Sequence, residues 1–221
     1  MLSRRAASFG ILASAGLAIA PASAAETARL QTVDLPQPWK TGGKPLAEAI
    51  WARRSIRAFA ARPLPIEVLS NLLWSAFGIN RPASGDRTAP SWRHAIESEI
   101  YVAAADGTWS YDAKKHRLTQ VLTEDIRTLT GVQEFVGTAS VDLVFVADGG
   151  RLEGASGSDK QLWAYTDTGF IGQNVYLFCA SEGLATVFRG SVDRARLGQK
   201  LGLPPSKFVT FSQTVGYPAA A

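Results

Sequence analysis

The segment from Lys160 to Glu182 constrains the fold of this chain more than any other. Its residues have helical spacing with apolar side chains on nearly every side, and Gly183 follows as a stop signal. A helix without a continuous polar face has to be buried, either in the core of a domain or in an interface between subunits. The sequence therefore predicts one long central helix.

Shorter helices and strands alternate irregularly around this helix. Helical spacing predicts further helices over residues 45–53, 65–77 and 193–201. Apolar runs bounded by turn residues predict strands over residues 99–104, 108–111, 141–147 and 208–215, with the first two joined in a hairpin at Asp106-Gly107. Because helices and strands are mixed without a regular βαβ repeat, the predicted fold class is α+β.

Composition bounds the possible functions. With 221 residues and 46% hydrophobic content, the chain can bury the core of one domain. Its net charge of +4 falls to +2 if Arg4 and Arg5 are removed with an N-terminal signal, which is too little to indicate a nucleic-acid partner. Cys179 is the only cysteine and there are two histidines, so no disulfide within the chain and no multi-His or Cys/His metal site is expected.

The N-terminus has the pattern of a cleaved export signal over residues 1–24. Arg4 and Arg5 supply a positive start, an apolar run follows over residues 9–20, and Ala22-Ser23-Ala24 forms a cleavage site. The apolar run is too short to span a bilayer, so no stable membrane anchor is expected. The predicted location is periplasmic or secreted, and the paired arginines suggest the twin-arginine route.

The mature chain is expected to begin with an extended arm. Residues 25–44 carry Pro36, Pro38, Gly42 and Gly43 and show little periodicity. The folded domain is predicted over residues 45–218.

A basic cluster, Arg53-Arg54-Ser55-Ile56-Arg57, follows the first predicted helix. Arginine presents a planar fork of donors that matches phosphate oxygens two at a time, and Ser55 adds a neutral donor between the forks. The same pattern also suits a solvated helix end, where cations complement the helix dipole. From these residues alone, a phosphate site and a solvated charge run remain open.

Four segments together resemble a known family. They are R-R-S-I-R-A-F at 53–59, T-A-P-S-W-R at 88–93, D-T-G-F-I-G-Q-N-V-Y-L-F-C-A-S-E-G-L-A-T at 167–186, and L-G-L-P followed by T-V-G-Y-P within 201–218. In order and spacing they resemble the nitroreductase superfamily of flavin enzymes, and the T-A-P-S form is most similar to its SagB-type branch, related to azoline-forming peptide oxidases. The resemblance implies an α+β sandwich with a mostly antiparallel sheet, a homodimer, and FMN bound at the subunit interface.

The resemblance also assigns cofactor contacts. Arg53, Ser55 and Arg57 are implied to hold the FMN phosphate and ribityl chain. Pro90 and Ser91 match the loop that touches the flavin from the partner subunit.

Contacts to the flavin ring follow from the same resemblance. The backbone of Arg189 and Gly190 is implied to face the flavin N5 edge, where a glycine permits close approach. Gln133 lies near the position of an amide that bonds the pyrimidine edge, although a solvent-facing glutamine on a helix is an equal alternative. The Arg189 side chain is a candidate to meet a substrate carboxylate, a cofactor phosphate or water. Trp163 and Tyr165 are candidates to line the pocket over the flavin ring, with core packing as the alternative.

The function implied by the resemblance is FMN-dependent hydride relay. A reduced nicotinamide, NAD(P)H, passes hydride to flavin N5, and the reduced flavin passes it to a small oxidised acceptor such as a nitroaromatic or a quinone. No side-chain base or metal is required. Because NAD(P)H is scarce outside the cytoplasm, export raises the prospect of a different physiological reductant.

Two alternatives stay open at this point. One is an azoline dehydrogenase that acts on modified peptides, although the Lys-Tyr pair of those enzymes is represented only by the non-adjacent Lys160 and Tyr165. The other is an exported flavin-binding or ligand-binding module with little turnover. It arises because the sequence ends at Pro218-Ala219-Ala220-Ala221, without the basic tail that adds phosphate contacts in relatives.

Overall fold

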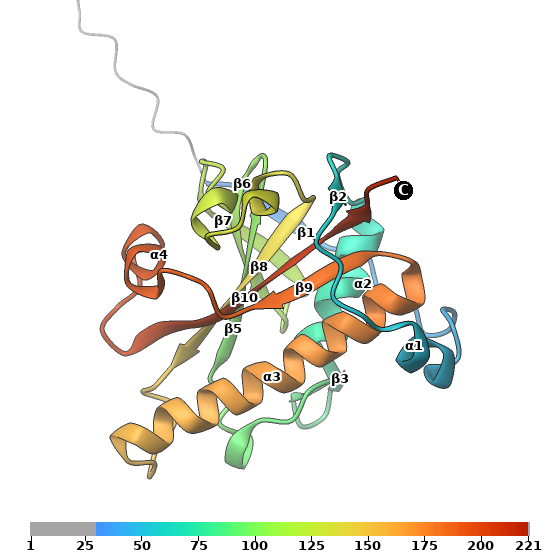
Figure 1. The fold of residues 1–221 in the computed structure, drawn as a ribbon. Coiled ribbons are helices and arrows are strands. Elements are labelled where there is room, and N and C mark those ends of the chain that lie inside the picture. The colour runs from blue at the N-terminus through green and yellow to red at the C-terminus, as the bar shows by residue number, and fades with distance from the viewer. Residues whose placement is uncertain (1–29, 221) are drawn as a thin grey trace, which may run out of the picture.

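An eight-stranded antiparallel sheet forms the centre of the protein (Figure 1). The computed structural model describes residues 30–220. The strands follow the order β1-β7-β6-β5-β8-β10-β2, and β9 also pairs with β10. Their bounds are β1 Thr32–Asp34, β2 Phe59–Ala60, β5 Ser98–Ala104, β6 Gly107–Asp112, β7 Arg117–Leu122, β8 Val141–Asp148, β9 Ala185–Arg189 and β10 Lys207–Pro218. A separate small hairpin joins β3 Ile79–Arg81 to β4 Asp86–Arg87.

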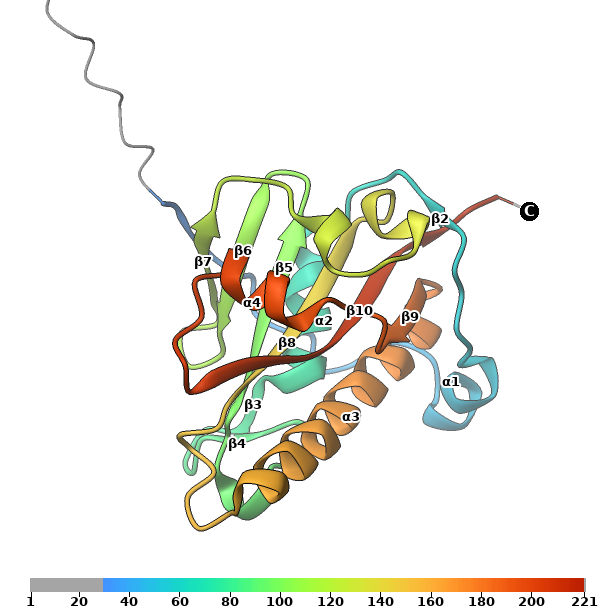
Figure 2. The same cartoon turned by 60° about the vertical axis from the view of Figure 1, so that its left-hand side comes forward.

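Helices cover both faces of this sheet (Figures 1 and 2). The bounds of the α-helices are α1 Leu46–Ala52, α2 Ile66–Phe77, α3 Gly157–Glu182 and α4 Arg194–Lys200. Three short 3-10 helices occur at Trp92–His94, Arg127–Leu129 and Glu134–Gly137. In both views α1 lies beside the C-terminal end of α3. The α+β prediction and the mostly antiparallel sheet are confirmed.

Strand β8 shows how the core is divided between the two faces. Successive residues of a strand point to opposite faces. Leu143 and Phe145 belong to the larger core cluster, which α2 and α3 cover, whereas Val144 and Val146 pack in a second cluster with α4. Because β8 lies between β5 and β10, it is the interior strand that its apolar run predicts.

Helix α3 begins three residues before its predicted start. The side chain of Ser156 accepts a hydrogen bond from the N–H of Asp159, so it caps the first turn and the helix starts at Gly157. Gly183 ends the helix with φ of +69°, a left-handed conformation that glycine adopts without strain. The glycine-rich segment before Lys160 is therefore partly helical.

Among residues 30–220, only one face of α3 is covered by other elements. Ile171, Val175 and Cys179 are fully buried against the sheet and α2. On the opposite face, Leu162 is 55% exposed and Phe170 is 45% exposed. Residues 30–220 thus leave the outer apolar face of α3 open.

The N-terminal arm is part of the sheet. Thr32–Asp34 pairs with β7 as an edge strand, and Leu35 is buried in the main core cluster. A three-residue strand is too short for its periodicity to be read from sequence. The predicted export signal over residues 1–24 lies outside the described residues. Between residues 30 and 220, no helix has the length and apolar character needed to cross a membrane.

Other element ends differ only slightly from prediction. Ala104 pairs with Gly107, so the hairpin loop is Ala105-Asp106 rather than Asp106-Gly107. The last strand extends to Pro218, because its end pairs with β2.

Candidate functional site

Segments that are distant in the sequence lie against the outer edge of β9. The carbonyl of Thr186 accepts a hydrogen bond from the N–H of Ile56 at 2.9 Å, and the N–H of Phe188 donates to the hydroxyl of Tyr176 at 2.9 Å. The opposite edge of β9 pairs with β10. Alternate residues of a strand present their backbone groups to the same edge, as Thr186 and Phe188 do. Gly190 is the first residue after β9, and its carbonyl accepts the N–H of Val192.

The basic cluster is held against this edge. Arg53 leaves α1 with ψ of 122°, an extended conformation that turns the chain away from the helix. Ser55 Oγ lies 2.7 Å from the hydroxyl of Tyr176, and the Arg53 guanidinium lies 5.2 Å from the centre of the Tyr176 ring. Arg57 is exposed. The cluster is therefore docked on α3 and β9, which a simple solvated helix end does not require.

The side chain of Arg189 points into the core. It is 4% exposed, and its Nη2 lies 2.7 Å from Oδ1 of Asp142 while its Nη1 donates to the carbonyl of Thr130 at 2.9 Å. The prediction that this side chain meets a substrate carboxylate, a cofactor phosphate or water is wrong. The physical reason is Asp142, a buried carboxylate on β8 that needs a cation.

Two opposing effects act on the pKa of the Asp142 carboxyl. Complete burial raises the pKa of Asp142 to about 6, against the attraction of Arg189 and a hydrogen bond from Thr214. The group is therefore ionised at neutral pH, and Arg189 and Asp142 form a neutral pair behind the edge of β9.

Gln133 lies beside Arg189. It precedes the 3-10 helix Glu134–Gly137, is half-buried, and its Oε1 finds no hydrogen-bond donor among residues 30–220. A Cβ added to Gly131 would lie 1.6 Å from Nη1 of Arg189 and 3.0 Å from Oε1 of Gln133, so only glycine fits there. Because Gln133 precedes the short helix and its Oε1 is enclosed, the alternative of a solvent-facing helical glutamine is wrong, and a contact with the flavin stays a prediction.

Pro90 and Ser91 lie elsewhere in the molecule. The backbone N–H of Trp92 donates to Oδ2 of Asp167 at 2.7 Å, which ties their loop to the N-terminal half of α3. Asp167 and Tyr176 are about nine residues apart on this helix, roughly 13 Å along its axis. Thr88 of the same loop bonds Asn174 on α3, and among residues 30–220 no hydrogen bond joins Pro90 or Ser91 to β9 or to the basic cluster.

The loop that follows Pro90 has a strained backbone. Arg93, His94 and Ile96 have φ of 47°, 59° and 49°, a region that side chains other than glycine rarely adopt. Ser91 Oγ accepts the N–H of Ile96 at 2.8 Å and donates to Oε2 of Glu97 at 2.9 Å. Such strain costs on the order of 1–3 kcal/mol per residue and persists only where surrounding contacts enforce it.

Two acidic side chains lie beneath this loop, and both are buried in the fold. Burial raises the pKa of Asp167 to about 6; the N–H of Trp92 opposes this shift, and the nearby Glu97 carboxyl adds to it. A carboxyl with a raised pKa binds more protons in the folded state than in the unfolded state. Its contribution to stability is therefore present at low pH and is lost as pH rises from the ordinary value of 3.8 to about 6.

Asp167→Asn is expected to make stability less dependent on pH. The amide still accepts the Trp92 N–H but does not ionise, so the variant should gain stability relative to the parent protein between pH 4 and about 6. Urea unfolding of both proteins at several pH values measures this difference, and the contribution of Asp142 cancels because both contain it. A difference that stays constant with pH would contradict the shift.

The aromatic candidates on α3 each pack against another aromatic ring. Trp163 stacks on Trp92 with ring centres 5.7 Å apart. Tyr165 packs edge-on against Phe211 at 5.0 Å. Both residues are half-buried and Tyr165 also lines an open cavity of about 410 Å³, so a role in a pocket stays a prediction.

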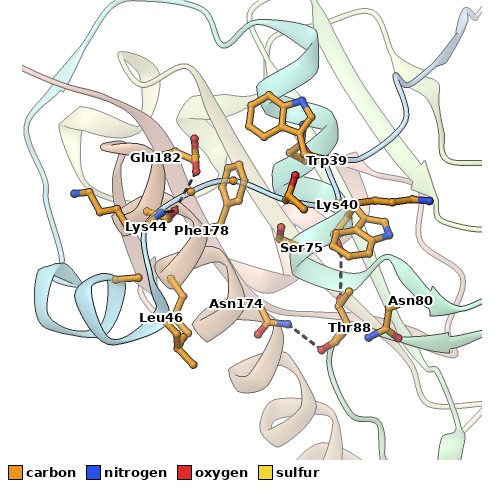
Figure 3. Close-up of a pocket in the computed structure, with 18 residues that line it drawn as sticks. Trp39, Lys40, Lys44, Leu46, Ser75, Asn80, Thr88, Asn174, Phe178 and Glu182 are labelled. Atoms are coloured by element: carbon orange, nitrogen blue, oxygen red, sulfur yellow. Dashed lines mark hydrogen bonds between the residues drawn. The ribbon is translucent and has the colours of Figure 1, made fainter.

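An open cavity of about 490 Å³ is bordered by α1, α2 and α3 (Figure 3). Segment 39–44, α1, α2 and the C-terminal half of α3 line it. Asn174 points toward Thr88 and donates to its carbonyl at 3.3 Å. None of the predicted cofactor contacts lines this cavity. In the described part of the chain, no group of three or more His, Cys, Asp or Glu side chains is placed to hold a metal.

Comparison with known proteins identifies the family. The profile of the nitroreductase family matches residues 50–217, which include α2, α3, α4 and every strand of the sheet except β1 and the last residue of β10. The chain belongs to the nitroreductase family. Members of this family are flavin oxidoreductases that typically bind FMN.

Individual relatives agree with this assignment. A candidate nitroreductase from Ralstonia eutropha JMP134 superposes with a TM-score of 0.82 at 39% identity, over 86% of this chain and 90% of that one. A candidate nitroreductase of Methanocaldococcus jannaschii is 29% identical over 66% of this chain and 78% of its own length. The NADPH:FMN oxidoreductase of Vibrio harveyi, solved with NAD⁺, superposes with a TM-score of 0.59 at 25% identity, over 79% and 69% of the two chains.

The resemblance to the SagB-type branch is only weakly supported. The microcin synthetase McbBCD complex of E. coli has a chain that superposes with a TM-score of 0.66 at 18% identity, over 85% of this chain and 78% of that chain. Identity this low shows a shared fold alone. The nitroreductase-like fold is confirmed, whereas the branch stays a prediction.

Proposed function

We propose that this nitroreductase-family protein binds FMN along the outer edge of β9 and uses it to transfer hydride from NAD(P)H to a small oxidised acceptor, such as a nitroaromatic or a quinone. One observation carries the proposal. The basic cluster lies along the outer edge of β9, Gly190 follows the last residue of this strand, and Gln133 lies beside the side chain of that residue, Arg189.

The residues at one end of this edge fit a phosphate. Arg53 and Arg57 supply two cationic forks, and Ser55 supplies a hydroxyl between them. None of the three is paired with a carboxylate in the described part of the chain. Their charges are thus available to a dianion, which forms charge-assisted hydrogen bonds with arginine.

The residues at the other end fit a flavin ring. The buried Oε1 of Gln133 accepts an N–H, such as the one at the pyrimidine edge of a flavin. Gly190 directly follows β9, and the absence of a side chain permits close approach of its backbone N–H. FMN, when bound, supplies the centre that accepts and donates hydride. The chain contributes binding, orientation and fixed hydrogen bonds, so no side-chain base is assigned.

A second copy of the chain completes this proposed site. Among residues 30–220 no hydrogen bond joins Pro90 or Ser91 to β9, so they are assigned to the flavin of a partner subunit. Apolar side chains on the outer surface of α1 and α3 provide a matching interface: Ile50 is 55% exposed and Trp51 is 90% exposed, alongside Leu162 and Phe170. Sedimentation of the purified protein tests this arrangement, which requires the mass of two chains.

The proposed location follows from the predicted signal. Cleavage after residue 24 leads to a periplasmic or secreted enzyme, whose reductant there need not be a nicotinamide.

Arg53→Ala is expected to weaken FMN binding roughly 10- to 100-fold, because hydrogen bonds to a charged group contribute about 1.5–3 kcal/mol. Fluorescence titration of the apoprotein with FMN measures the loss. Arg54→Ala is the matched control, since the Arg54 side chain is exposed and bonds only the carbonyl of Ala52. Equal affinities for the Arg53 variant and the parent protein would place the phosphate elsewhere.

Turnover tests the proposed reaction separately. FMN bound to the parent protein should lose its yellow colour on addition of NADPH and regain it with a quinone or a nitroaromatic. A parent protein that does not bind added FMN would refute the proposed function.

A further inference from the structure

The hydroxyl of Tyr176 joins the basic cluster to β9. Its oxygen lies 2.7 Å from Oγ of Ser55 and accepts a hydrogen bond of 2.9 Å from the N–H of Phe188. Ser55 precedes β2, Tyr176 is on α3 and Phe188 is on β9. One side chain therefore fixes the distance between the proposed phosphate end and the strand that leads to Gly190.

Either hydroxyl of the Ser55–Tyr176 pair can be the donor, and the proposal takes Tyr176 as the donor. A tyrosine hydroxyl has one proton to donate. The N–H of Phe188 already occupies the Tyr176 oxygen as an acceptor, so the proton of Tyr176 is available for Ser55. With Tyr176 as donor, Ser55 accepts through Oγ and keeps its own proton for a further acceptor. This arrangement leaves Ser55 ready to donate to an anion.

The ring of Tyr176 acts on a second member of the cluster. The Arg53 guanidinium lies 5.2 Å from the ring centre, within the range of a cation–π interaction. A guanidinium stacked on a ring loses fewer orientations when it binds a phosphate. The hydroxyl thus orients Ser55, and the ring restrains Arg53.

We propose that Tyr176 is a positioning residue for the phosphate of FMN. It is assigned no contact with the flavin ring and would act through Ser55 and Arg53, which it holds in place for the phosphate. Because this role requires FMN to bind along β9, it rests on the proposed function. The phosphate is the distinguishing group, so a flavin without a phosphate provides the decisive comparison.

Tyr176→Phe tests the hydroxyl while keeping the ring. The affinity of the apoprotein for FMN should fall about ten-fold, the usual effect of losing one oriented hydrogen bond to a charged group. The affinity for riboflavin, which lacks the phosphate, should be unchanged. Fluorescence titrations of both flavins give the ratio of the two affinities, which a general loss of structure does not change in this way.

Two further variants sharpen the result. Ser55→Ala should reduce FMN affinity as Tyr176→Phe does, and the double variant should lose little more, because both remove the same oriented donor. Tyr217→Phe is the matched control. The guanidinium of Arg62 lies 3.9 Å from the centre of the Tyr217 ring, a contact like that of Arg53 with Tyr176, but Tyr217 lies on β10. The FMN affinity of this variant should equal that of the parent protein.

The possible failures are distinguishable. If the parent protein binds neither flavin, the proposed function fails. If the parent protein binds FMN and Tyr176→Phe binds it equally well, or if the variant loses FMN and riboflavin affinity by the same factor, the positioning role is overturned. Circular dichroism and urea unfolding of each variant establish that it is folded before the titration.

Discussion

Asp142→Ala is expected to lower the free energy of unfolding by about 3–5 kcal/mol, the usual cost of removing one partner from a buried ion pair. The substitution leaves the Arg189 guanidinium buried without its carboxylate, because Asp142 is fully buried and Arg189 is 4% exposed. Thr214 loses its acceptor as well. The loss should appear as a lower urea midpoint with an unchanged slope.

A matched control and a double variant test whether the loss of stability comes from the unpaired buried charge. Asp34→Ala removes one partner of the exposed pair Asp34–Arg117, whose atoms are 2.6 Å apart, and should leave the midpoint nearly unchanged. Combining Asp142→Ala with Arg189→Met removes both charges and should recover part of the stability lost by Asp142→Ala. Equal losses for Asp34→Ala and Asp142→Ala would contradict the buried-pair assignment.

Phe145→Ala is expected to cost about 3–5 kcal/mol, as large-to-small changes in a packed core do. Phe145 is fully buried on β8, and its ring centre lies 5.9 Å from that of Phe188 on β9. The cavity should also loosen Phe188, whose N–H bonds Tyr176. Urea unfolding measures the stability, and hydrogen exchange of the Phe188 amide reports the local effect.

Phe170→Ala is the matched control for Phe145→Ala. The residue type is the same, but Phe170 is 45% exposed on the outer face of α3. Its removal should change the stability of the chain by only about 0.5 kcal/mol and act instead on association of the proposed dimer. Losses of similar size for the two variants would show that the outer face of α3 is packed within the chain.

The long helix and the interior strand were predictable because their signals are local. Residues 160–182 and 141–147 carry continuous apolar patterns that few other structures satisfy. Strand β9 was missed, since its five residues follow directly on a long helix and its partners are remote in sequence. Ile56, which bonds Thr186, is separated from it by most of the domain. Edge pairings of this kind have no local signature.

The candidate site was predictable to a similar degree. The placement of Arg53 and Ser55 beside β9 agrees with the resemblance that singled them out, and their role stays a prediction. The Arg189 side chain was assigned wrongly, although the sequence held a signal: Asp142 is the one charged residue in the predicted strand 141–147, and a buried carboxylate needs a cation. Tyr176 gave no signal, because a tyrosine on an apolar helix usually indicates core packing.

Helix α3 has a further consequence in the proposed dimer. At Tyr176 it supports the phosphate end of the site in its own chain, and at Asp167 it holds the loop assigned to the flavin of the partner. An α-helix of 26 residues moves largely as one rigid body. In the proposed dimer, a displacement of α3 would therefore reach both the phosphate end of one site and the loop assigned to the other.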